Sequence, residues 1–207
     1  PIRRTLLGEI SGFKRASTAL TFDVASGKIT MFIGPLLGGV LMQNFGIYSF
    51  YLLAIGLLGF ALLFVSRLQI TSMAVQTQTV HFLRSMRDGL THAKNNKPIL
   101  SVLLLTIILN FFGYSFISMI PVIGTGKLEL SPVSVGLLSS MMGAGALINL
   151  LLLTIFTNSK YFMRFFLGGT LALLVAIILF SISPWYSLAL IVLFAGGLGE
   201  AGFSSMQ

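Results

Sequence analysis

Glu200 is a carboxylic acid inside an apolar segment of the chain, "FAGGLGEAG". An ionisable side chain in such a segment is costly to bury and therefore marks a functional hypothesis by default. The glycines around it would allow another helix or a substrate to come close. We predict that Glu200 lines a cavity and takes part in proton coupling. The alternative is that the segment ends earlier, which would leave the carboxylate hydrated and inert near the membrane surface.

Two further charged side chains, Asp23 and Lys28, lie in or at the edge of the first apolar segment. Five residues place them about 140° apart around a helix, so they are not expected to pair with each other. Lys28 either reaches the lipid headgroups or forms an ion pair with another helix, possible partners including helices outside this chain. Asp23 either caps its helix or binds a basic group nearby. A coupling or gating role is predicted for both residues, together with Glu200.

Uncharged polar side chains mark two other apolar segments. Asn110 and Tyr114 lie one helical turn apart, and Thr106 and Ser118 extend the same stripe. This stripe is predicted to line the cavity and to offer hydrogen bonds to a polar substrate, and so is Asn149. The alternative for each is a hydrogen bond to a neighbouring helix.

Enzymatic chemistry finds little support in the sequence. Cysteine is absent, which excludes thiol nucleophiles, thiolate metal sites and disulfides. His81 and His92 lie at no metal-ligand spacing, and no serine, histidine and aspartate constellation or phosphate-binding loop occurs. We therefore predict no enzyme activity, no metal and no cofactor.

The composition indicates an integral membrane protein. Hydrophobic residues make up 56% of the chain and charged residues only 9%, and the mean hydropathy is +0.97. Soluble domains are roughly one quarter charged. The net charge of +8 is more readily explained by membrane topology than by nucleic-acid binding, so no nucleic-acid partner is predicted.

Six segments are apolar enough to cross a bilayer, which needs about 20 residues per helix. The predicted fold is therefore an all-α, polytopic transmembrane helical bundle. Its expected spans are Thr21 to Met42, Ile47 to Val65, Pro98 to Ile120, Val135 to Phe156, Phe165 to Ile182 and Pro184 to Gln207.

The basic residues predict the orientation of these spans, because cytoplasmic loops are enriched in lysine and arginine. The opposite loops hold Lys127, with Glu129 close by. The loops expected in the cytoplasm hold Arg3, Arg4, Lys14, Arg15, Arg67, Arg84, Arg87, Lys94, Lys97, Lys160 and Arg164. Both ends of the chain are therefore expected on the cytoplasmic side of a bacterial inner membrane.

Three regions are predicted along the chain: 1–66, 67–97 and 98–207. The middle region is a basic cytoplasmic linker, in which Phe82, Leu83, Met86 and Leu90 form one stripe of an amphipathic helix. Such a helix would lie at the headgroups or against the floor of the bundle. A regulatory or partner-binding role is the alternative.

Glycine and proline are concentrated in "MFIGPLLGGVLM", residues 31–42. Small residues let membrane helices approach closely, and a proline inside a helix favours a bend. Gly34, Pro35, Gly38 and Gly39 are therefore predicted to form a helix-packing motif. The face expected to pack contains Gly27, Thr30, Gly34 and Gly38. "GAGA", at 143–146, is a second predicted packing surface.

"GPLLGG" resembles the core of a motif in the fifth helix of the major facilitator superfamily, which is associated with exporters that work by antiport. Thr21 and Thr30 stand at two earlier positions that are glycine in the fuller motif. The longer stretch 3–39 resembles the branch that contains enterobactin exporters and macrolide efflux proteins. In that comparison Asp23 matches a family acid, while Lys28 and Met31 replace an asparagine and an arginine. "MRDGLTHAKNNKPIL", "GLLSSMMGAGAL" and "GLGEAGFSSMQ" are similar to the same branch.

This resemblance implies a partial major facilitator fold, comprising the fifth to tenth helices of a twelve-helix transporter. It implies efflux of small amphipathic molecules by alternating access, driven by proton antiport. The implied partners are a small-molecule substrate, protons, the lipid bilayer and the missing helices of the same transporter. The competing interpretation is a non-transporting membrane protein, or a transporter remnant that acts in assembly.

Overall fold

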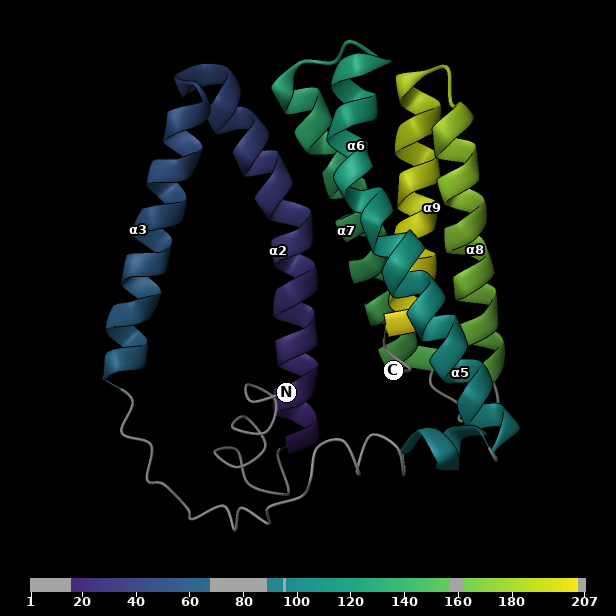
Figure 1. Cartoon of the computed structure of the whole chain (residues 1–207). Coiled ribbons are helices and arrows are strands. Elements are labelled where there is room, and N and C mark those ends of the chain that lie inside the picture. Colours follow the sequence, from purple (N-terminus) through teal and green to yellow (C-terminus); the bar gives the residue numbers. More distant parts are fainter. Residues whose placement is uncertain (1–15, 68–88, 95, 157–161, 205–207) are drawn as a thin grey trace. The chain divides into compact units, whose positions relative to one another are not determined.

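The structure, a computed structural model, describes residues 16–67, 89–94, 96–156 and 162–204. These residues form helices and short turns, with no strand among them (Figure 1). The main elements are α2 (Ala16–Phe45), α3 (Ile47–Ser66), α5 (Lys97–Ile108), the π-helix η1 (Leu109–Gly113), α6 (Tyr114–Gly126), α7 (Pro132–Phe156), α8 (Phe162–Ile182) and α9 (Tyr186–Ser204). The predicted all-α membrane bundle is thereby confirmed.

Each predicted span contains a helix, although several ends differ. Helix α2 begins before Thr21, and the third segment continues past Ile120 to Gly126 as α5, η1 and α6. Pro121 therefore lies inside a helix, which membrane helices tolerate because neighbouring groups satisfy the freed carbonyl. By length and composition, four described helical stretches could cross a membrane: Thr18–Phe45, Ile47–Ser66, Ile99–Gly126 and Pro132–Leu152. Two shorter apolar helices are Phe166–Ile182 and Tyr186–Glu200.

Local sequence explains where several helices begin and end. Gly46 separates α2 from α3 and adopts a φ of 79°, which is a conformation that glycine adopts without strain. Pro98 lies in the first turn of α5, and Pro132 is the first residue of α7. Proline suits this position because its missing N–H would have no intrahelical partner there.

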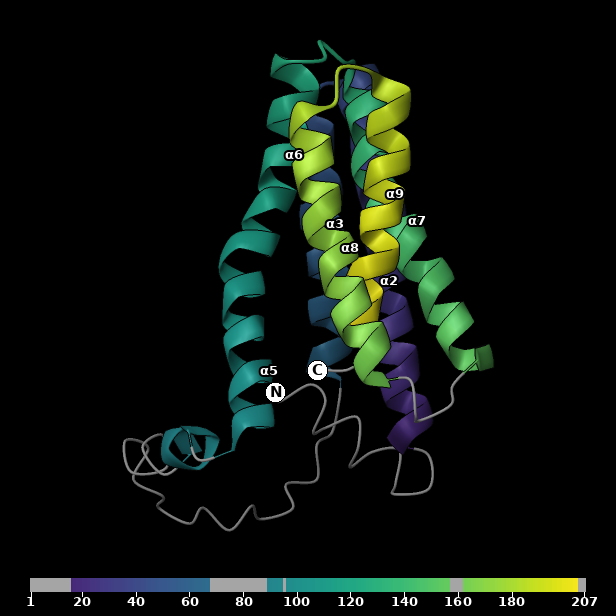
Figure 2. The same cartoon turned by 90° about the vertical axis from the view of Figure 1, so that its right-hand side faces the viewer.

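The chain divides into two compact units, residues 1–50 with 116–207 and residues 51–115. In the first unit α7 is central, because it packs against both α2 and α9, and α9 packs in turn against α8 (Figures 1 and 2). Its core includes Leu138, Met142, Phe180 and Leu193, all less than 3% exposed. Phe116 of α6 meets Phe180 of α8 edge to face, with ring centroids 5.4 Å apart.

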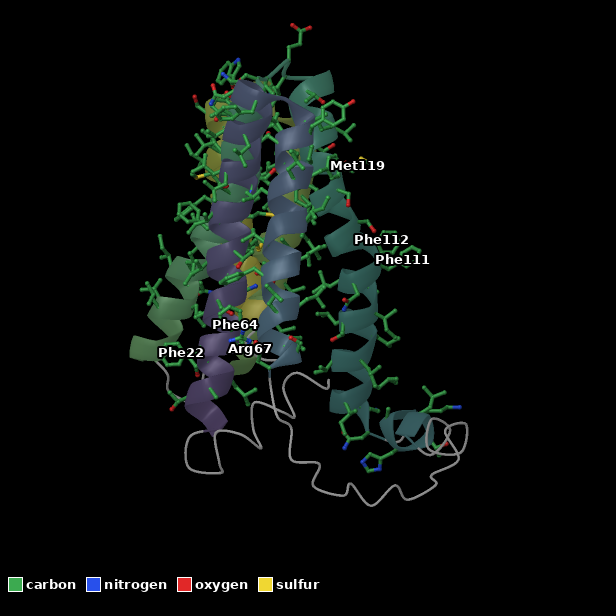
Figure 3. The ribbon with its side chains drawn as sticks, turned by 90° about the vertical axis from the view of Figure 1, so that its left-hand side faces the viewer. Phe22, Phe64, Arg67, Phe111, Phe112 and Met119 are labelled. Atoms are coloured by element: carbon green, nitrogen blue, oxygen red, sulfur yellow. The ribbon has the colours of Figure 1, made fainter. Side chains whose placement is uncertain are left out.

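The second unit contains most of α3, residues 89–94, α5 and η1. Helix α3 has no buried residue, and the side chains of Phe111 and Phe112 in η1 project away from their helix (Figure 3). Phe82, Leu83 and Met86 of the predicted amphipathic stripe lie outside the described residues. The predicted division into 1–66, 67–97 and 98–207 stays a prediction.

Helix α8 shows how a uniformly apolar helix divides between core and membrane. Phe166, Leu173, Ala176 and Phe180 are buried. The opposite face is more than half exposed and carries Leu171, Val175, Ile178 and Ile182. These exposed residues recur every three or four positions, as expected for one side of a helix facing lipid.

Candidate functional site

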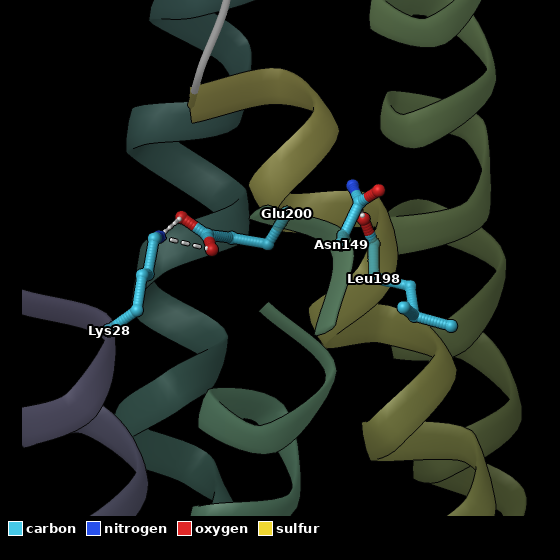
Figure 4. Close-up of polar contacts among 4 residues, drawn as sticks. All are labelled: Lys28, Asn149, Leu198 and Glu200. Carbon is cyan, nitrogen blue, oxygen red and sulfur yellow. Dashed lines mark hydrogen bonds and ion pairs between the residues drawn. The ribbon is translucent and has the colours of Figure 1, made fainter. Parts of the chain in front are cut away.

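An ion pair joins α2 to α9 inside the first unit. The Lys28 Nζ atom lies 2.7 Å from Oε1 and 2.5 Å from Oε2 of Glu200, and it donates a hydrogen bond to each oxygen (Figure 4). The two side chains are only 13% and 5% exposed. A short, charge-assisted contact of this kind is much stronger than an exposed ion pair, because little water screens it.

This geometry decides between the alternatives left by the sequence for both residues. Glu200 is buried and bonded, so the interpretation of a hydrated carboxylate is wrong. Lys28 forms the interhelical ion pair instead of reaching for the headgroups, and its partner lies within this chain. Removing either charge alone would leave the other buried without this partner, which costs several kcal/mol.

Backbone contacts hold α9 between α7 and α8 close to Glu200. A methyl group added at Gly197 would collide with the carbonyl of Met142 in α7, and one at Gly199 with the carbonyl of Gly169 in α8. Gly145 of the "GAGA" segment lies equally close to the carbonyl of Phe194. The predicted packing role of this segment is therefore confirmed. These contacts set the distance of α9, which carries Glu200, from α7 and α8.

Asn149 of α7 bonds to the backbone of α9 near the same place. Its Nδ2 group donates to the carbonyl oxygen of Leu198 at 2.6 Å (Figure 4). The sequence left open whether Asn149 lines a cavity or bonds to a neighbouring helix. The structure shows the interhelical bond.

Asn110 and Tyr114 belong to the second compact unit, whereas Lys28, Asn149 and Glu200 belong to the first. Within the first unit the structure gathers Lys28, Asn149 and Glu200. Asn110 Nδ2 donates to the carbonyl of Thr106 in its own helix at 2.8 Å, and the Tyr114 side chain lies outside the described side chains. The π-helix at 109–113 is notable because such segments often occur at functional positions.

Asp23 shares α2 with Lys28 but is not part of the ion pair that links α2 to α9. Its side chain is partly exposed, and its backbone carbonyl accepts a hydrogen bond from Ser26 Oγ at 2.8 Å. The predicted separation of Asp23 from Lys28 around the helix is consistent with this arrangement. Its gating role stays a prediction.

The glycine and proline motif packs against α7, but through a different face from the one expected. A methyl group at Gly39 would collide with the carbonyl of Pro132, and one at Gly136 with the carbonyl of Pro35. Gly143 of α7, two turns beyond Gly136, lies against the backbone of Met31 and Phe32. The contacting face of α2 is therefore 31–32, 35 and 39, because α7 offers its own glycines opposite those positions.

Gly27 and Gly34, which were expected at the seam, would meet nothing within 4 Å if a methyl group were added. A methyl group added at Gly38 would lie 3.2 Å from the Phe50 ring. Gly34 and Gly38 instead border an almost entirely apolar cavity of about 470 Å³. The other residues that line it are Pro35, Gly39, Met42, Phe50, Pro121, Thr125, Pro132, Val135, Gly136 and Ser139.

Gly136 and Gly143 of α7 were missed as the partners of this motif. Their spacing of seven residues, two helical turns, places both on one face and was the available signal. Among the described residues no cluster of histidine and acidic side chains could hold a metal ion.

Comparison with known proteins gives one match. The sequence profile of the Major Facilitator Superfamily matches residues 1–207. Comparisons with curated proteins and with solved structures find no match. The profile spans the whole chain and agrees with its bundle of apolar helices, its glycine-lined seam and its buried intramembrane charges. The chain therefore belongs to the Major Facilitator Superfamily of membrane transporters.

Proposed function

We propose that the protein is part of a secondary active transporter that exports small amphipathic molecules from the cytoplasm in exchange for protons. Membership of a transporter family supports transport over the competing interpretation of a non-transporting membrane protein. The direction of transport and the drug-like or siderophore-like class of substrate follow from the resemblance of "GPLLGG" and its surroundings to antiport exporters.

The Lys28–Glu200 ion pair carries the proposal of proton coupling. A buried carboxylate is stabilised by its ammonium partner, and neutralising it with a proton removes that attraction. Proton binding at Glu200 would therefore weaken the link between α2 and α9. A site with these properties can couple proton movement to helix movement.

The helices on either side of the pair fit an alternating-access mechanism, in which two halves of a transporter rock about a central site. We assign residues 1–66 to the end of one half and 98–207 to the start of the other. These correspond to the fifth to tenth helices of a twelve-helix protein. Lys28 and Glu200 then lie on opposite halves. Asn110 and Tyr114 would line the substrate cavity, and Asp23 would act in gating.

The charge distribution supports a location in a bacterial inner membrane. Both ends of the chain and the loops 66–97 and 157–164 would lie in the cytoplasm, where basic loops are retained. Lys127 and Glu129, in the turn between α6 and α7, would lie on the opposite side.

The test is a proton-gradient-dependent efflux assay on the full-length protein in lipid vesicles, with an amphipathic fluorescent dye as the probe. Glu200→Gln keeps the size of the side chain but cannot exchange a proton. We expect dye flux to continue down its own gradient, while acceleration by an imposed proton gradient is lost. The matched control is Glu129→Gln, because Glu129 is exposed in a turn. An unchanged response of Glu200→Gln to the proton gradient would remove Glu200 from the mechanism.

A further inference from the structure

The segment of α9 that carries Glu200 is unusually poor in side chains. It reads "GGLGE" from Gly196 to Glu200, and glycine weakens a helix interior by about 1 kcal/mol. Its contacts with α7 and α8 are largely between backbones. Packing of this kind sets how close the helices lie through van der Waals contact. It contributes no side-chain hydrogen bond between α9 and its neighbours.

The hydrogen bond from Asn149 adds a directional contact between α7 and α9 to this packing. Nδ2 of Asn149 lies 2.6 Å from the carbonyl oxygen of Leu198, two residues before Glu200, and both groups are partly buried. Two residues correspond to a rotation of about 200° and a rise of about 3 Å in an α-helix. Asn149 therefore holds one side of α9 while Glu200 projects from nearly the opposite side, where Lys28 lies (Figure 4).

We propose that Asn149 is a positioning residue for Glu200. It fixes the rotation of the glycine-rich end of α9 so that the carboxylate meets Lys28. The inference rests on the proposed coupling role of Glu200, and it assigns Asn149 to the proton site rather than to the wall of the substrate cavity. Asn149 touches neither the carboxylate nor the ammonium group in the bonds described, and acts through the backbone of Leu198.

Chemical cross-linking tests this arrangement independently of transport. The chain has no cysteine, so an introduced pair can be cross-linked selectively in a full-length protein free of other cysteines. Lys28→Cys and Glu200→Cys report the facing of α2 and α9 through a short thiol-specific cross-linker. Adding Asn149→Leu, which removes the donor but keeps the side-chain size, is expected to lower the yield about fivefold, as loss of one hydrogen bond implies.

A second cysteine pair distinguishes positioning from general packing. A methyl group at Gly124 would lie 3.1 Å from a methyl carbon of Val135, so Gly124→Cys with Val135→Cys reports the contact of α6 with α7, in which α9 takes no part. Asn149→Leu is expected to leave this yield unchanged. Asn149→Gln, which keeps an amide donor, is expected to restore part of the Lys28→Cys and Glu200→Cys yield. Asn110→Leu, whose amide bonds within its own helix, is expected to leave the yield of the same pair at its original value.

Two results would overturn the inference. One is an unchanged yield at 28 and 200 in Asn149→Leu, and the other is an equal fall in yield for both cysteine pairs. Neither result bears on the efflux response of Glu200→Gln, which tests the proposed function by itself. Coupling lost in Glu200→Gln, with cross-linking insensitive to Asn149, would leave the proposed function standing and remove the positioning role.

Discussion

Helix α2 meets its neighbours in two physically different ways along its length. Along the proline–glycine end, from Met31 to Gly39, its backbone lies directly on α7 at Gly143, Gly136 and Pro132. At the charged end, defined by Lys28, contact is made through a long side chain that reaches Glu200 of α9. The first contact joins main chains, and the second joins two charged groups.

The difference shows which end can respond to conditions. Close packing of small residues is driven by van der Waals contact and does not change with pH. An ion pair requires both charges, so one proton on the carboxylate is enough to weaken it. The backbone contacts of α2 with α7 are therefore independent of pH, whereas its side-chain contact with Glu200 of α9 depends on charge.

The largest effect on stability is expected when only one charge of the Lys28–Glu200 pair is removed. Lys28→Met leaves the Glu200 carboxylate buried without its ammonium partner, which is expected to lower stability by about 3–5 kcal/mol. The double substitution Lys28→Met with Glu200→Gln removes both charges and should recover most of this loss. Thermal unfolding of the purified protein in detergent measures both. A double variant as unstable as the single one would contradict the importance of the pair.

A smaller effect is expected at the proline–glycine end. Gly136→Ala places a methyl group against the carbonyl of Pro35, and overpacking of this kind costs typically about 1–3 kcal/mol. Because the obstructing atom belongs to the backbone, the contact can be relieved only by moving α2 away from α7. The unfolding temperature should fall equally at pH 5 and pH 8. A loss confined to one pH would show that packing and charge are not separable.

The smallest effect is expected on the face of α2 that the sequence alone suggested for packing. The methyl groups added by Gly34→Ala and Gly27→Ala would meet nothing within 4 Å. Each substitution is therefore expected to change stability by no more than about 0.5 kcal/mol. The same unfolding assay applies, with Gly136→Ala measured alongside. Strong destabilisation by Gly34→Ala would mean that this face packs against another helix in the full transporter.

The chemistry of the candidate site was partly predictable. Glu200 and Lys28 stood out because charged groups are rare in apolar segments, and Asn149 stood out in the same way. Their partners were not predictable. Lys28 and Glu200 are 172 residues apart, and no spacing within a helix indicates which other helix lies beside it. The same limit applied to Asn149, for which the sequence allowed either a cavity or an interhelical bond.

The sequence by itself determined the helices of this protein. An apolar run in a bilayer must satisfy its own backbone hydrogen bonds, and for a single segment a helix does so. Several helix ends were indicated by Gly46, Pro98 and Pro132. Only the tertiary structure decided which face of each helix packs against a neighbour. Gly39 packs and Gly34 does not, because α7 places Gly136 and Gly143 opposite one side of α2. Burial of the charged pair likewise depends on three helices meeting, which is a property of their arrangement and not of any one segment.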